Sequence, residues 1–372
     1  MQFKNLDERK NFYRNKAYSE IESLATKHNE VIVCLPTGYG KTLVAIKLYE
    51  KLAKGSPFLF LVPETPLIQN AKDDFIKHGR GDLLEYGTFA CYASAKNFIG
   101  QDFSMIIADE VHNAVSDLRI EALIGINHKR FVGLSATLTE EQVVTLLKVA
   151  PFQMYIKTLD EGINEGVLAK PVIKEICIDL DDSVKRNVFM YGKKEVTLTD
   201  RGYYDALSSS ITYWRELYEV EGKPFQANKM KSMGAQRQRF LADCKEPYVR
   251  ALIQNLGEQR FICFCGSVDQ ALRLGENVCS SKKSKKGNDQ LIKDFNAFVI
   301  NSLFAKDMLK EGTNLVATNY GILIQPGNSE KDFIQMLGRT LRSDNPTFYI
   351  FRANNTVDDR FLKNSMKQLN NG

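Results

Sequence analysis

The seven residues from Pro36 to Thr42 read Pro-Thr-Gly-Tyr-Gly-Lys-Thr, and these types in this order suit the binding of phosphate. Glycines let backbone N–H groups approach phosphate oxygens closely, and a lysine beside them reaches the terminal phosphates of a nucleotide. A threonine after the lysine offers its hydroxyl to Mg²⁺. A glycine-rich turn without a ligand is the alternative. We predict that five residues bind the nucleotide and its metal ion: Thr37, Gly38, Gly40, Lys41 and Thr42.

The segments on either side of this loop are those that a phosphate site needs. The apolar run 31–35 predicts a buried strand that ends at the loop, and residues 43–52 have the pattern of a helix that follows it. In this order the positive end of the helix dipole faces the phosphate. The sequence therefore predicts a strand, a phosphate loop and a helix in succession.

A second group of candidate residues, Asp109-Glu110-Val111-His112, follows the apolar run 105–108. Carboxylates at the C-terminal end of a parallel strand lie where such sheets bind ligands. Asp109 is suited to hold Mg²⁺ through water, and Glu110 to activate the water that attacks a γ-phosphate. An acidic pair alone is more often a helix cap. Together with the upstream loop, the pair favours catalysis.

The third group lies far downstream, in the segment from Gln335 to Arg342. Arg339 and Arg342 are three positions apart, so on a helix they share one face. They suit a pair of arginine fingers that contact the γ-phosphate, which elsewhere accelerate phosphoryl transfer by roughly 10³ to 10⁵. A solvated helix face or a salt bridge is the alternative interpretation.

In this combination the chain resembles a superfamily 2 helicase, a nucleic-acid-dependent ATPase with a DEVH box at Asp109 to His112. The resemblance spans almost the whole chain. It implies ATP and Mg²⁺ as cofactors, a nucleotide contact at Gly312, and catalytic roles for Lys41, Asp109, Glu110, Gln335, Arg339 and Arg342. Further segments match the family's other motifs in order: Ser135 to Thr137, Leu61 to Asn70, Phe261 to Ser267, and Phe304 to Asn314.

Four positions depart from the family's pattern, and one of them is Lys306, which stands where a hydroxyl residue is common in its motif. Glu64 stands where a small hydroxyl residue is usual, and its charge would repel a nucleic-acid phosphate. Ala17 stands three places after Arg14, where many members carry the glutamine that reads adenine, so selection of adenine over other bases is left open. Asn314 lacks the charge of the acidic residue common in its motif.

The expected fold is α/β, with two tandem RecA-like domains whose parallel sheets are covered by helices on both faces. Apolar runs alternate with helical stretches throughout the chain. We expect domain one at 1–165 and domain two at 166–372, with a helical insertion at about 181–250. The runs read as strands are 31–35, 58–62, 103–108 and 131–134, then 172–180, 261–265, 297–303, 320–325 and 347–351.

Three surface segments are candidates for contact with nucleic acid. One is the basic piece from Lys229 to Arg239, which either follows phosphates or forms a solvated helix face. The stretch from Tyr203 to Tyr218 is rich in aromatic residues, which either stack on bases or pack the helices of the insertion. Four lysines lie between Ser281 and Gly287, where a solvated loop is the simpler interpretation.

Composition is compatible with these predictions but does not select among them. The chain has 372 residues and a net charge of +5, too small a charge to argue for a nucleic-acid partner. Seven cysteines without a C-x-x-C pair favour a reducing compartment. No apolar run approaches the ~20 residues that cross a bilayer. We expect a cytoplasmic protein, or a nuclear one in a eukaryote, with no membrane partner.

The predicted function is ATP-dependent movement on nucleic acid, or its unwinding, with contacts mainly to the backbone. Val111 and Gln335 differ from the residues typical of the best-known RNA remodellers, which favours DNA over RNA. Three alternatives stay open: a duplex translocase that does not separate strands, an RNA helicase, and an ATP-switched clamp. An unidentified protein partner is also left open.

Overall fold

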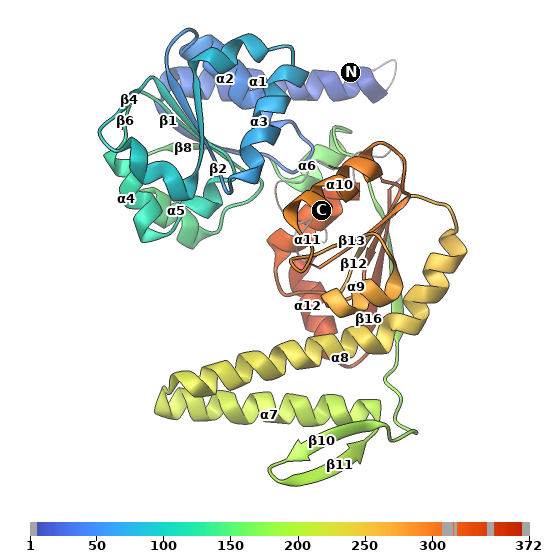
Figure 1. Cartoon of the computed structure of the whole chain (residues 1–372). Helices are drawn as coiled ribbons and strands as arrows, with labels where there is room; N and C mark the ends of the chain where they lie inside the picture. Colours follow the sequence, from blue (N-terminus) through green and yellow to red (C-terminus); the bar gives the residue numbers. More distant parts are fainter. Residues whose placement is uncertain (1–5, 307–314, 316–317, 341–345, 367–372) are drawn as a thin grey trace. The chain divides into compact units, whose positions relative to one another are not determined.

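Two α/β units make up the chain, and they divide between Lys170 and Pro171 (Figure 1). The computed structural model describes residues 6–306, 315, 318–340 and 346–366. The side chains at 6, 330, 331, 335, 339 and 340 are also outside this description. None of the helices among the described residues combines the length and apolar character needed to span a membrane.

The first unit is built on a six-stranded sheet whose paired strands are all parallel, in the order β3-β2-β5-β7-β1-β8. The four strands in the middle of this order lie within or beside the predicted apolar runs. The edge strands β3 and β8 were not predicted, because they are only partly buried and lack a continuous apolar run. The strands are β1 Glu30–Cys34, β2 Phe58–Val62, β3 Gly87–Cys91, β5 Met105–Ala108, β7 Phe131–Ser135 and β8 Gln153–Ile156.

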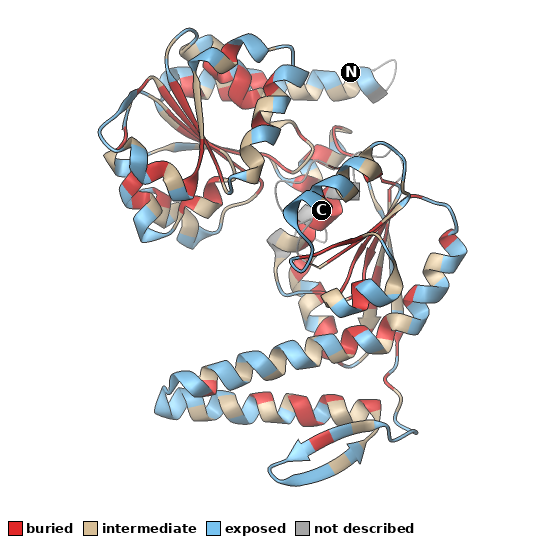
Figure 2. Ribbon diagram, in the orientation of Figure 1, coloured by how far each residue is buried: buried red, intermediate tan, exposed pale blue. Residues whose placement is uncertain are grey.

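Helices cover both faces of this sheet because successive strand residues point to opposite sides. Val31 and Val33 of β1 pack with α1, α2 and α3, whereas Ile32 and Cys34 pack with α4 and α5 on the other face. The four inner strands β2, β5, β7 and β1 are accordingly buried at nearly every position (Figure 2). The helices are α1 Leu6–Lys27, α2 Lys41–Leu52, α3 Pro66–Lys77, α4 Asp117–Gly125, α5 Glu140–Leu146 and α6 Leu159–Asn164. Shorter elements are η1 Gly81–Tyr86, η2 Tyr92–Phe98, η3 Val111–Ala114, β4 Asp102–Phe103 and β6 Asn127–His128.

The second unit has a six-stranded sheet in the order β13-β14-β12-β15-β16-β9, again with parallel pairing throughout. Cys263 and Phe351 pack on the face that α8 and α9 cover, and Phe348 packs on the other face against Phe333 of α11. The α/β class with two parallel sheets is therefore confirmed. The strands are β9 Val172–Ile178, β12 Phe261–Phe264, β13 Val278–Cys279, β14 Ser302–Ala305, β15 Tyr320–Leu323 and β16 Thr347–Ala353. The helices are α8 Pro224–Leu256, α9 Val268–Leu274, α10 Lys285–Asn296, α11 Glu330–Thr340 and α12 Val357–Ser365.

One strand of the second unit was placed wrongly by the sequence. The run 297–303 was read as a strand, but Ala297 caps α10 and the strand β14 begins only at Ser302. Phe298 and Val299 are exposed apolar residues, with 63% and 71% of their surfaces accessible. Phe298 also has a left-handed φ of 61°, which a strand residue does not adopt. The run was therefore predicted wrongly because hydrophobic residues in a turn gave the same apolar pattern as a buried strand.

The insertion between β9 and β12 contains a hairpin as well as helices. We call β10 Asn187–Tyr191, β11 Lys194–Leu198, α7 Asp200–Glu221 and the first half of α8 the arm (Figure 1). Its core includes Phe189, Leu207 and Tyr203, whose ring lies 4.8 Å from that of Phe240. Tyr204 is also buried, and its hydroxyl accepts a hydrogen bond from Val357 N at 2.8 Å. The aromatic residues at the base of the arm therefore pack its elements together.

Candidate active site

The phosphate loop connects β1 to α2, as the sequence predicted, and two of its glycines have left-handed backbones. The φ angles are 88° at Gly38 and 108° at Gly40, values that side-chain-bearing residues rarely adopt. A Cβ on Gly40 would lie 2.7 Å from the Tyr18 hydroxyl, so a side chain there would displace either the loop or Tyr18. Lys41 is the first residue of α2. The backbone thus has the glycine-dependent form of a phosphate cradle at a helix start.

The acidic pair lies at the C-terminal end of β5, at the same edge of the sheet as the loop. Lys41 Nζ is 3.6 Å from Glu110 Oε1, so the predicted phosphate-binding lysine and the predicted base are brought together. Glu110 has a left-handed φ of 45°, a strained conformation that is typical of functional positions. Its Oε2 is buried and has no hydrogen-bond partner among the described residues. That oxygen is available to a ligand.

Asp109 is held by the backbone around it. Its N–H donates to Leu61 O at 2.8 Å, and its Oδ1 accepts from Glu110 N at 3.0 Å. Burial, followed by the charge of Glu110, raises the pKa of Asp109 to about 7, while Lys41 acts in the opposite direction. A buried carboxylate with a raised pKa gains from a nearby cation.

The hydroxyl of Thr42 is held at the start of α2. Thr42 Oγ1 donates to Asp74 Oδ2 of α3 at 3.4 Å. Asp74 also raises the pKa of Asp109, so its charge is felt at the acidic pair. Oxygen donors of this kind are those that Mg²⁺ prefers, and the residues present fit such an ion. The sequence analysis missed Asp74, because its position in a helix 32 residues after Thr42 gives no local signal.

The histidine of the DEVH segment joins two strands of the sheet. His112 Nδ1 lies 2.9 Å from Ser135 Oγ at the end of β7. Because the Ser135 hydroxyl donates to Thr137 O at 2.8 Å, its oxygen accepts the hydrogen bond from His112 Nδ1–H. His112 Nδ1 also lies 3.5 Å from Glu110 Oε2. The ends of β5, β7 and β1, which are neighbours in the sheet, therefore carry one connected group of side chains.

The predicted residues of the second unit are described only in part. Gln335 and Arg339 lie on α11, after β15, but their side chains are outside the description. Arg342 and Gly312 fall outside the described residues altogether. Their predicted contacts with a nucleotide therefore stay predictions.

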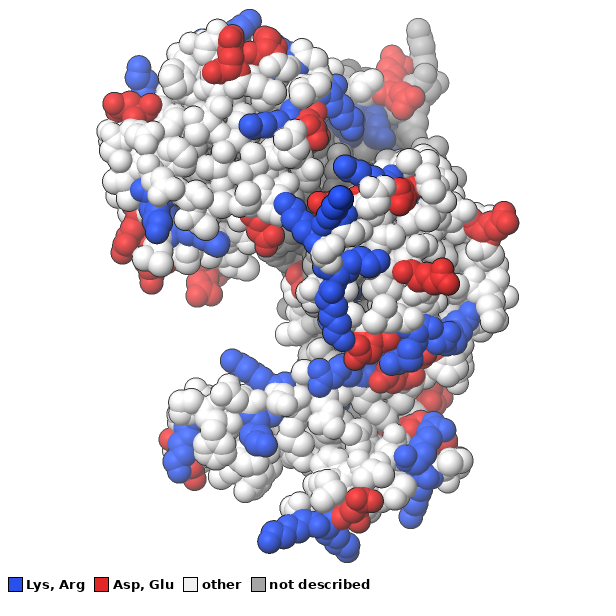
Figure 3. Space-filling model, in the orientation of Figure 1, with Lys and Arg blue, Asp and Glu red and all other residues white. Residues whose placement is uncertain are grey.

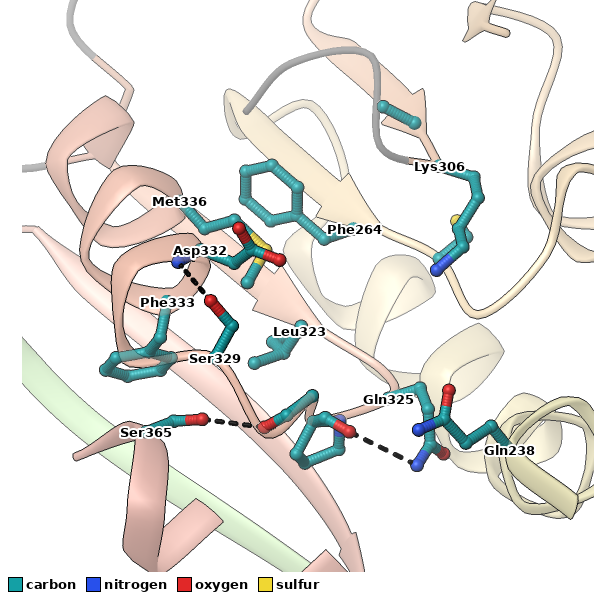
Figure 4. A pocket seen from close by; sticks show the side chains of 14 residues that line it. Gln238, Phe264, Lys306, Leu323, Gln325, Ser329, Asp332, Phe333, Met336 and Ser365 are labelled. Carbon is teal, nitrogen blue, oxygen red and sulfur yellow. Dashed lines mark hydrogen bonds between the residues drawn. The ribbon is translucent and has the colours of Figure 1, made fainter. Parts of the chain in front are cut away.

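A pocket opens where β12, β14 and β15 end (Figure 4). Lys306, Gln325 and Asp332 are among the side chains that line it. On its floor Ser365 Oγ donates to Gly327 O at 2.7 Å. The pocket thus lies beside the segments that match the family's motifs in the second unit.

The lysines between Ser281 and Gly287 were expected in a loop, but two of them open a helix. Ser284 caps α10 and accepts a hydrogen bond from Gly287 N at 3.2 Å, so Lys285 and Lys286 lie in the first turn. Lys282 is paired with Asp269 at 2.8 Å. Figure 3 shows basic side chains gathered over α9 and α10, with acidic ones mixed in along α8.

Comparison with known families gives two matches along the chain. Residues 9–90 match the family described as the res subunit of type III restriction enzymes, and residues 244–344 match the helicase conserved C-terminal domain. The first range includes the phosphate loop, and the second includes α11.

Three curated relatives differ in how much they share with the chain. The DNA 3'-5' translocase XPB2 of Sulfurisphaera tokodaii is 24% identical over 85% of this chain and 75% of its own length. A putative ATP-dependent RNA helicase of Methanocaldococcus jannaschii is 19% identical over 94% of this chain and 59% of its own. The type I restriction enzyme EcoAI endonuclease subunit of Escherichia coli is 25% identical over 46% of this chain and 24% of its own.

The fold resembles that of a solved helicase. The Hef helicase domain of Pyrococcus furiosus aligns with 95% of this chain and 97% of its own, at a TM-score of 0.54 and 17% sequence identity. At that identity the likeness concerns the fold, which is the tandem RecA-like arrangement that the sequence predicted.

Proposed function

The chain belongs to helicase superfamily 2, and from that membership we propose that it hydrolyses ATP to move along DNA. As a member it is an ATP-hydrolysing enzyme that acts on nucleic acid, of the helicase or translocase type. The observation that carries the assignment of the site is the 3.6 Å separation of Lys41 Nζ and Glu110 Oε1 at one edge of a parallel sheet.

We assign the steps of hydrolysis to residues of the first unit. Lys41 and the backbone N–H groups of the loop bind the β- and γ-phosphates. Glu110 orients the attacking water and accepts its proton at Oε2, the oxygen that has no hydrogen-bond partner among the described residues. His112 and Ser135 keep the carboxylate in position from the neighbouring strand ends.

Asp109 and Thr42 are the residues that would hold Mg²⁺. Their oxygens suit the ion, and the raised pKa of Asp109 indicates a carboxylate that needs a cation beside it. When bound, Mg²⁺ supplies positive charge to the β- and γ-phosphate oxygens. We propose also that Gln335, Arg339 and Arg342 act on the transferring phosphate, which rests on the sequence alone.

The proposal of DNA rests on the residues of two motifs and on one relative. Val111 and Gln335 stand where the best-known RNA remodellers carry other residues. The relative XPB2 is named as a DNA translocase. RNA remains the outcome that the first experiment is designed to detect.

That experiment is steady-state ATP hydrolysis without a polymer and then with single-stranded DNA, duplex DNA, forked DNA and RNA. We expect DNA to stimulate the rate, and Lys41→Ala to abolish it, because the lysine neutralises the transferring phosphate. Glu110→Gln should also abolish turnover, while ATP still binds. Wild-type hydrolysis in either variant would refute the assignment, and stimulation by RNA alone would refute DNA as the track.

Movement on duplex without strand separation is a second candidate, favoured by a specific observation. Between Thr318 and Thr340 the described residues form only β15, a turn and α11, with no β-hairpin to split strands. A strand-displacement assay on forked DNA, run beside displacement of a triplex strand from duplex DNA, separates the two. Triplex displacement without duplex unwinding identifies a translocase.

A further inference from the structure

Tyr39 is an aromatic residue inside the phosphate loop, and it is completely buried. It lies between the two left-handed glycines, at a position where the phosphate cradle itself requires no large side chain. Its N–H donates to Pro36 O at 3.1 Å, which closes the loop upon itself. The ring therefore points into the first unit, where it contacts elements that are remote in sequence.

The Tyr39 hydroxyl donates to a carboxylate that follows α6. The distance to Glu165 Oε2 is 3.1 Å, and the other oxygen of Glu165 pairs with Lys157 Nζ at 2.8 Å. Burial, followed by the charge of Glu165, raises the pKa of Tyr39, so the hydroxyl keeps its proton. Hydrogen bonds to charged groups are about twice as strong as neutral ones. The loop is thus anchored to one partly buried ion pair.

Glu165 belongs to a segment that leads out of the first unit. We call residues 157–170 the connector. At its start Lys157 N donates to Cys34 O at the end of β1. At its end Leu168 is buried, two residues before the division of the chain at Lys170.

The connector also touches the loop directly. A Cβ placed on Gly38 would meet Leu168 Cδ2 at 3.4 Å, and one on Gly162 would meet Leu168 Cδ1 at 3.0 Å and Pro36 Cγ at 3.6 Å. The Leu168 side chain therefore lies beside both the loop glycine Gly38 and the connector glycine Gly162. Movement of the loop by a few tenths of an ångström must be accommodated by the connector, because packed interiors transmit strain.

On its other side the loop is held by α1. Arg14 Nη2 donates to Gly38 O at 3.1 Å, and the Tyr18 hydroxyl lies 3.5 Å from Tyr39 O. These contacts fix the backbone carbonyls of the loop. Adjustment on phosphate binding is thereby directed towards the connector.

We propose that Glu165 is a positioning residue for the phosphate loop, acting through Tyr39, and that this contact couples nucleotide binding to the connector. The proposal rests on the assignment of the loop as an ATP site, and it deepens that assignment. The coupled segment is the one through which the chain passes into the second unit. Nucleotide binding therefore changes the mobility of the passage between the units.

Hydrogen exchange of peptides that cover 159–170 tests the coupling in the full chain. In the wild type, Mg²⁺ with a non-hydrolysable ATP analogue should slow exchange there at least about threefold, since ordered segments open less often. Tyr39→Phe removes only the hydroxyl, and Glu165→Ala removes its acceptor. Both variants should lose this slowing.

Tyr155→Phe is the matched control. The Tyr155 hydroxyl donates to Glu20 Oε2 at 2.8 Å, so the control removes a tyrosine–glutamate hydrogen bond of the same kind and leaves the hydrogen bond between Tyr39 and Glu165 in place. Its exchange in 159–170 should respond to nucleotide as the wild type does. A loss of the response in all three variants would mean a general loosening of the unit and would overturn the proposal.

The KM for ATP is a measurement that would not change if Glu165 had only a structural role. Loss of a charge-assisted hydrogen bond that fixes the loop should raise KM for ATP about tenfold in Glu165→Ala, with a smaller fall in kcat. Glu165→Gln, which still accepts from Tyr39, should recover most of the affinity. Equal KM values in wild type and Glu165→Ala would overturn the positioning role.

Hydrogen exchange measured in the absence of nucleotide tests the contact between Tyr39 and Glu165 independently of the proposed ATPase function. Tyr39→Phe should exchange faster than the wild type in 159–170 even when no nucleotide is present. If hydrolysis is absent but this difference is found, the ATPase assignment fails and the contact stands. If Lys41-dependent hydrolysis is found but the connector does not respond in any state, the coupling fails alone.

Discussion

At the scale of single residues, the charge of Asp109 links the stability of the first unit to what binds beside it. Its pKa is raised to about 7, first because the carboxyl is buried and second because Glu110 is charged. The folded protein therefore holds a proton that the unfolded chain has released. Folding stability falls as pH rises from about 4 towards 7 and then levels off, because the unfolded state binds fewer protons across that range.

Asp109→Asn should stabilise the metal-free protein, and more so at pH 8 than at pH 5. Each unit of pKa shift corresponds to roughly 1.4 kcal/mol, so the gain at pH 8 is of the order of a few kcal/mol. Urea unfolding in the presence of EDTA at four pH values measures it. Asp102→Asn, at an exposed position, controls for the change in net charge. A gain in Asp109→Asn that does not depend on pH would contradict the raised pKa.

The sequence analysis identified the site residues that stand in short motifs. It did not identify residues that contact the site from distant parts of the sequence. Lys41, Thr42 and Glu110 stand in short segments whose order of strand, loop and helix carries the signal. Asp74 reaches Thr42 across 32 residues, and Glu165 reaches Tyr39 across 126. Such pairs depend on how helices pack on the sheet, which periodicity does not determine.

At the scale of elements, the turn from β1 into α2 depends on glycine for two separate reasons. Gly40 combines a left-handed φ of 108° with a Cβ position that lies 2.7 Å from the Tyr18 hydroxyl. Gly55 has a left-handed φ of 77° with no atom within 4 Å of its Cβ position. Substitutions at Gly40 and Gly55 therefore distinguish the free-energy cost of a left-handed backbone from the additional cost of a steric contact.

Gly40→Ala should therefore damage the ATP site, whereas Gly55→Ala should lower only the free energy of unfolding, by about 1 kcal/mol. The alanine at position 40 displaces either the loop or Tyr18, so the affinity for ATP should fall at least about tenfold. Binding of a fluorescent ATP analogue and thermal unfolding distinguish the two effects. Equal nucleotide affinity in both variants would show that the contact with Tyr18 is unimportant.

The second half of α8, which continues from the arm, is fixed to the rest of the second unit by a charged pair that is fully buried. Lys245 Nζ of α8 lies 2.5 Å from Asp358 Oδ2 of α12 and 2.8 Å from Gln325 Oε1, which follows β15. Gln325 Nε2 donates in turn to Asp358 Oδ1 at 2.6 Å. Burial lowers the pKa of Lys245, and the charge of Asp358 opposes this. Three elements thus meet at one point.

Lys245→Met alone should destabilise the second unit by about 3 to 5 kcal/mol, because it leaves the buried carboxylate of Asp358 without a cation beside it. Lys245→Met with Asp358→Leu should cost less than the single change, since no unpaired charge remains. Chemical unfolding of the four proteins in a double-mutant cycle measures the coupling. Additive effects would show that the two charges do not stabilise each other.

Four of the strands that the sequence revealed share one physical property, burial on both faces, whereas β9 was also revealed although most of its residues are exposed or only partly buried. β1, β2, β5 and β12 are buried at nearly every position, so the apolar run itself is the signal. β8 and β10 are largely exposed or only partly buried, and neither was predicted. The apolar turn at Phe298 and Val299 shows the converse error, in which exposed hydrophobic residues were read as a strand.

At the scale of the whole molecule, some lysines lie at a helix end where their positive charge lowers the stability of the fold. Lys285 and Lys286 occupy the first turn of α10, which contains no acidic residue, although the helix dipole disfavours cations there. Their cost to stability makes a role in binding an anionic polymer worth testing.

Charge reversal of Lys283, Lys285 and Lys286 should raise the stability of the protein and weaken its binding to DNA. The dependence of log K on log salt should become shallower by roughly 0.7 for each phosphate of a single strand that these lysines no longer neutralise. Lys282 is left unchanged because it pairs with Asp269. Fluorescence anisotropy over a range of salt concentrations measures the slope. An unchanged slope would exclude these lysines from the binding surface.

In the sheet of the second unit, the strand that comes first in the chain, β9, pairs with the strand that comes last, β16. Val172 of β9 lies opposite Thr347 of β16, and the pairing continues in register to Ile178 and Ala353. During synthesis β9 leaves the ribosome long before its partner exists, and contacts between residues so distant in sequence form slowly. The unit must wait, with an unpaired strand edge exposed, until β16 has been made. Chains that stall before residue 347 are therefore expected to be substrates for chaperones.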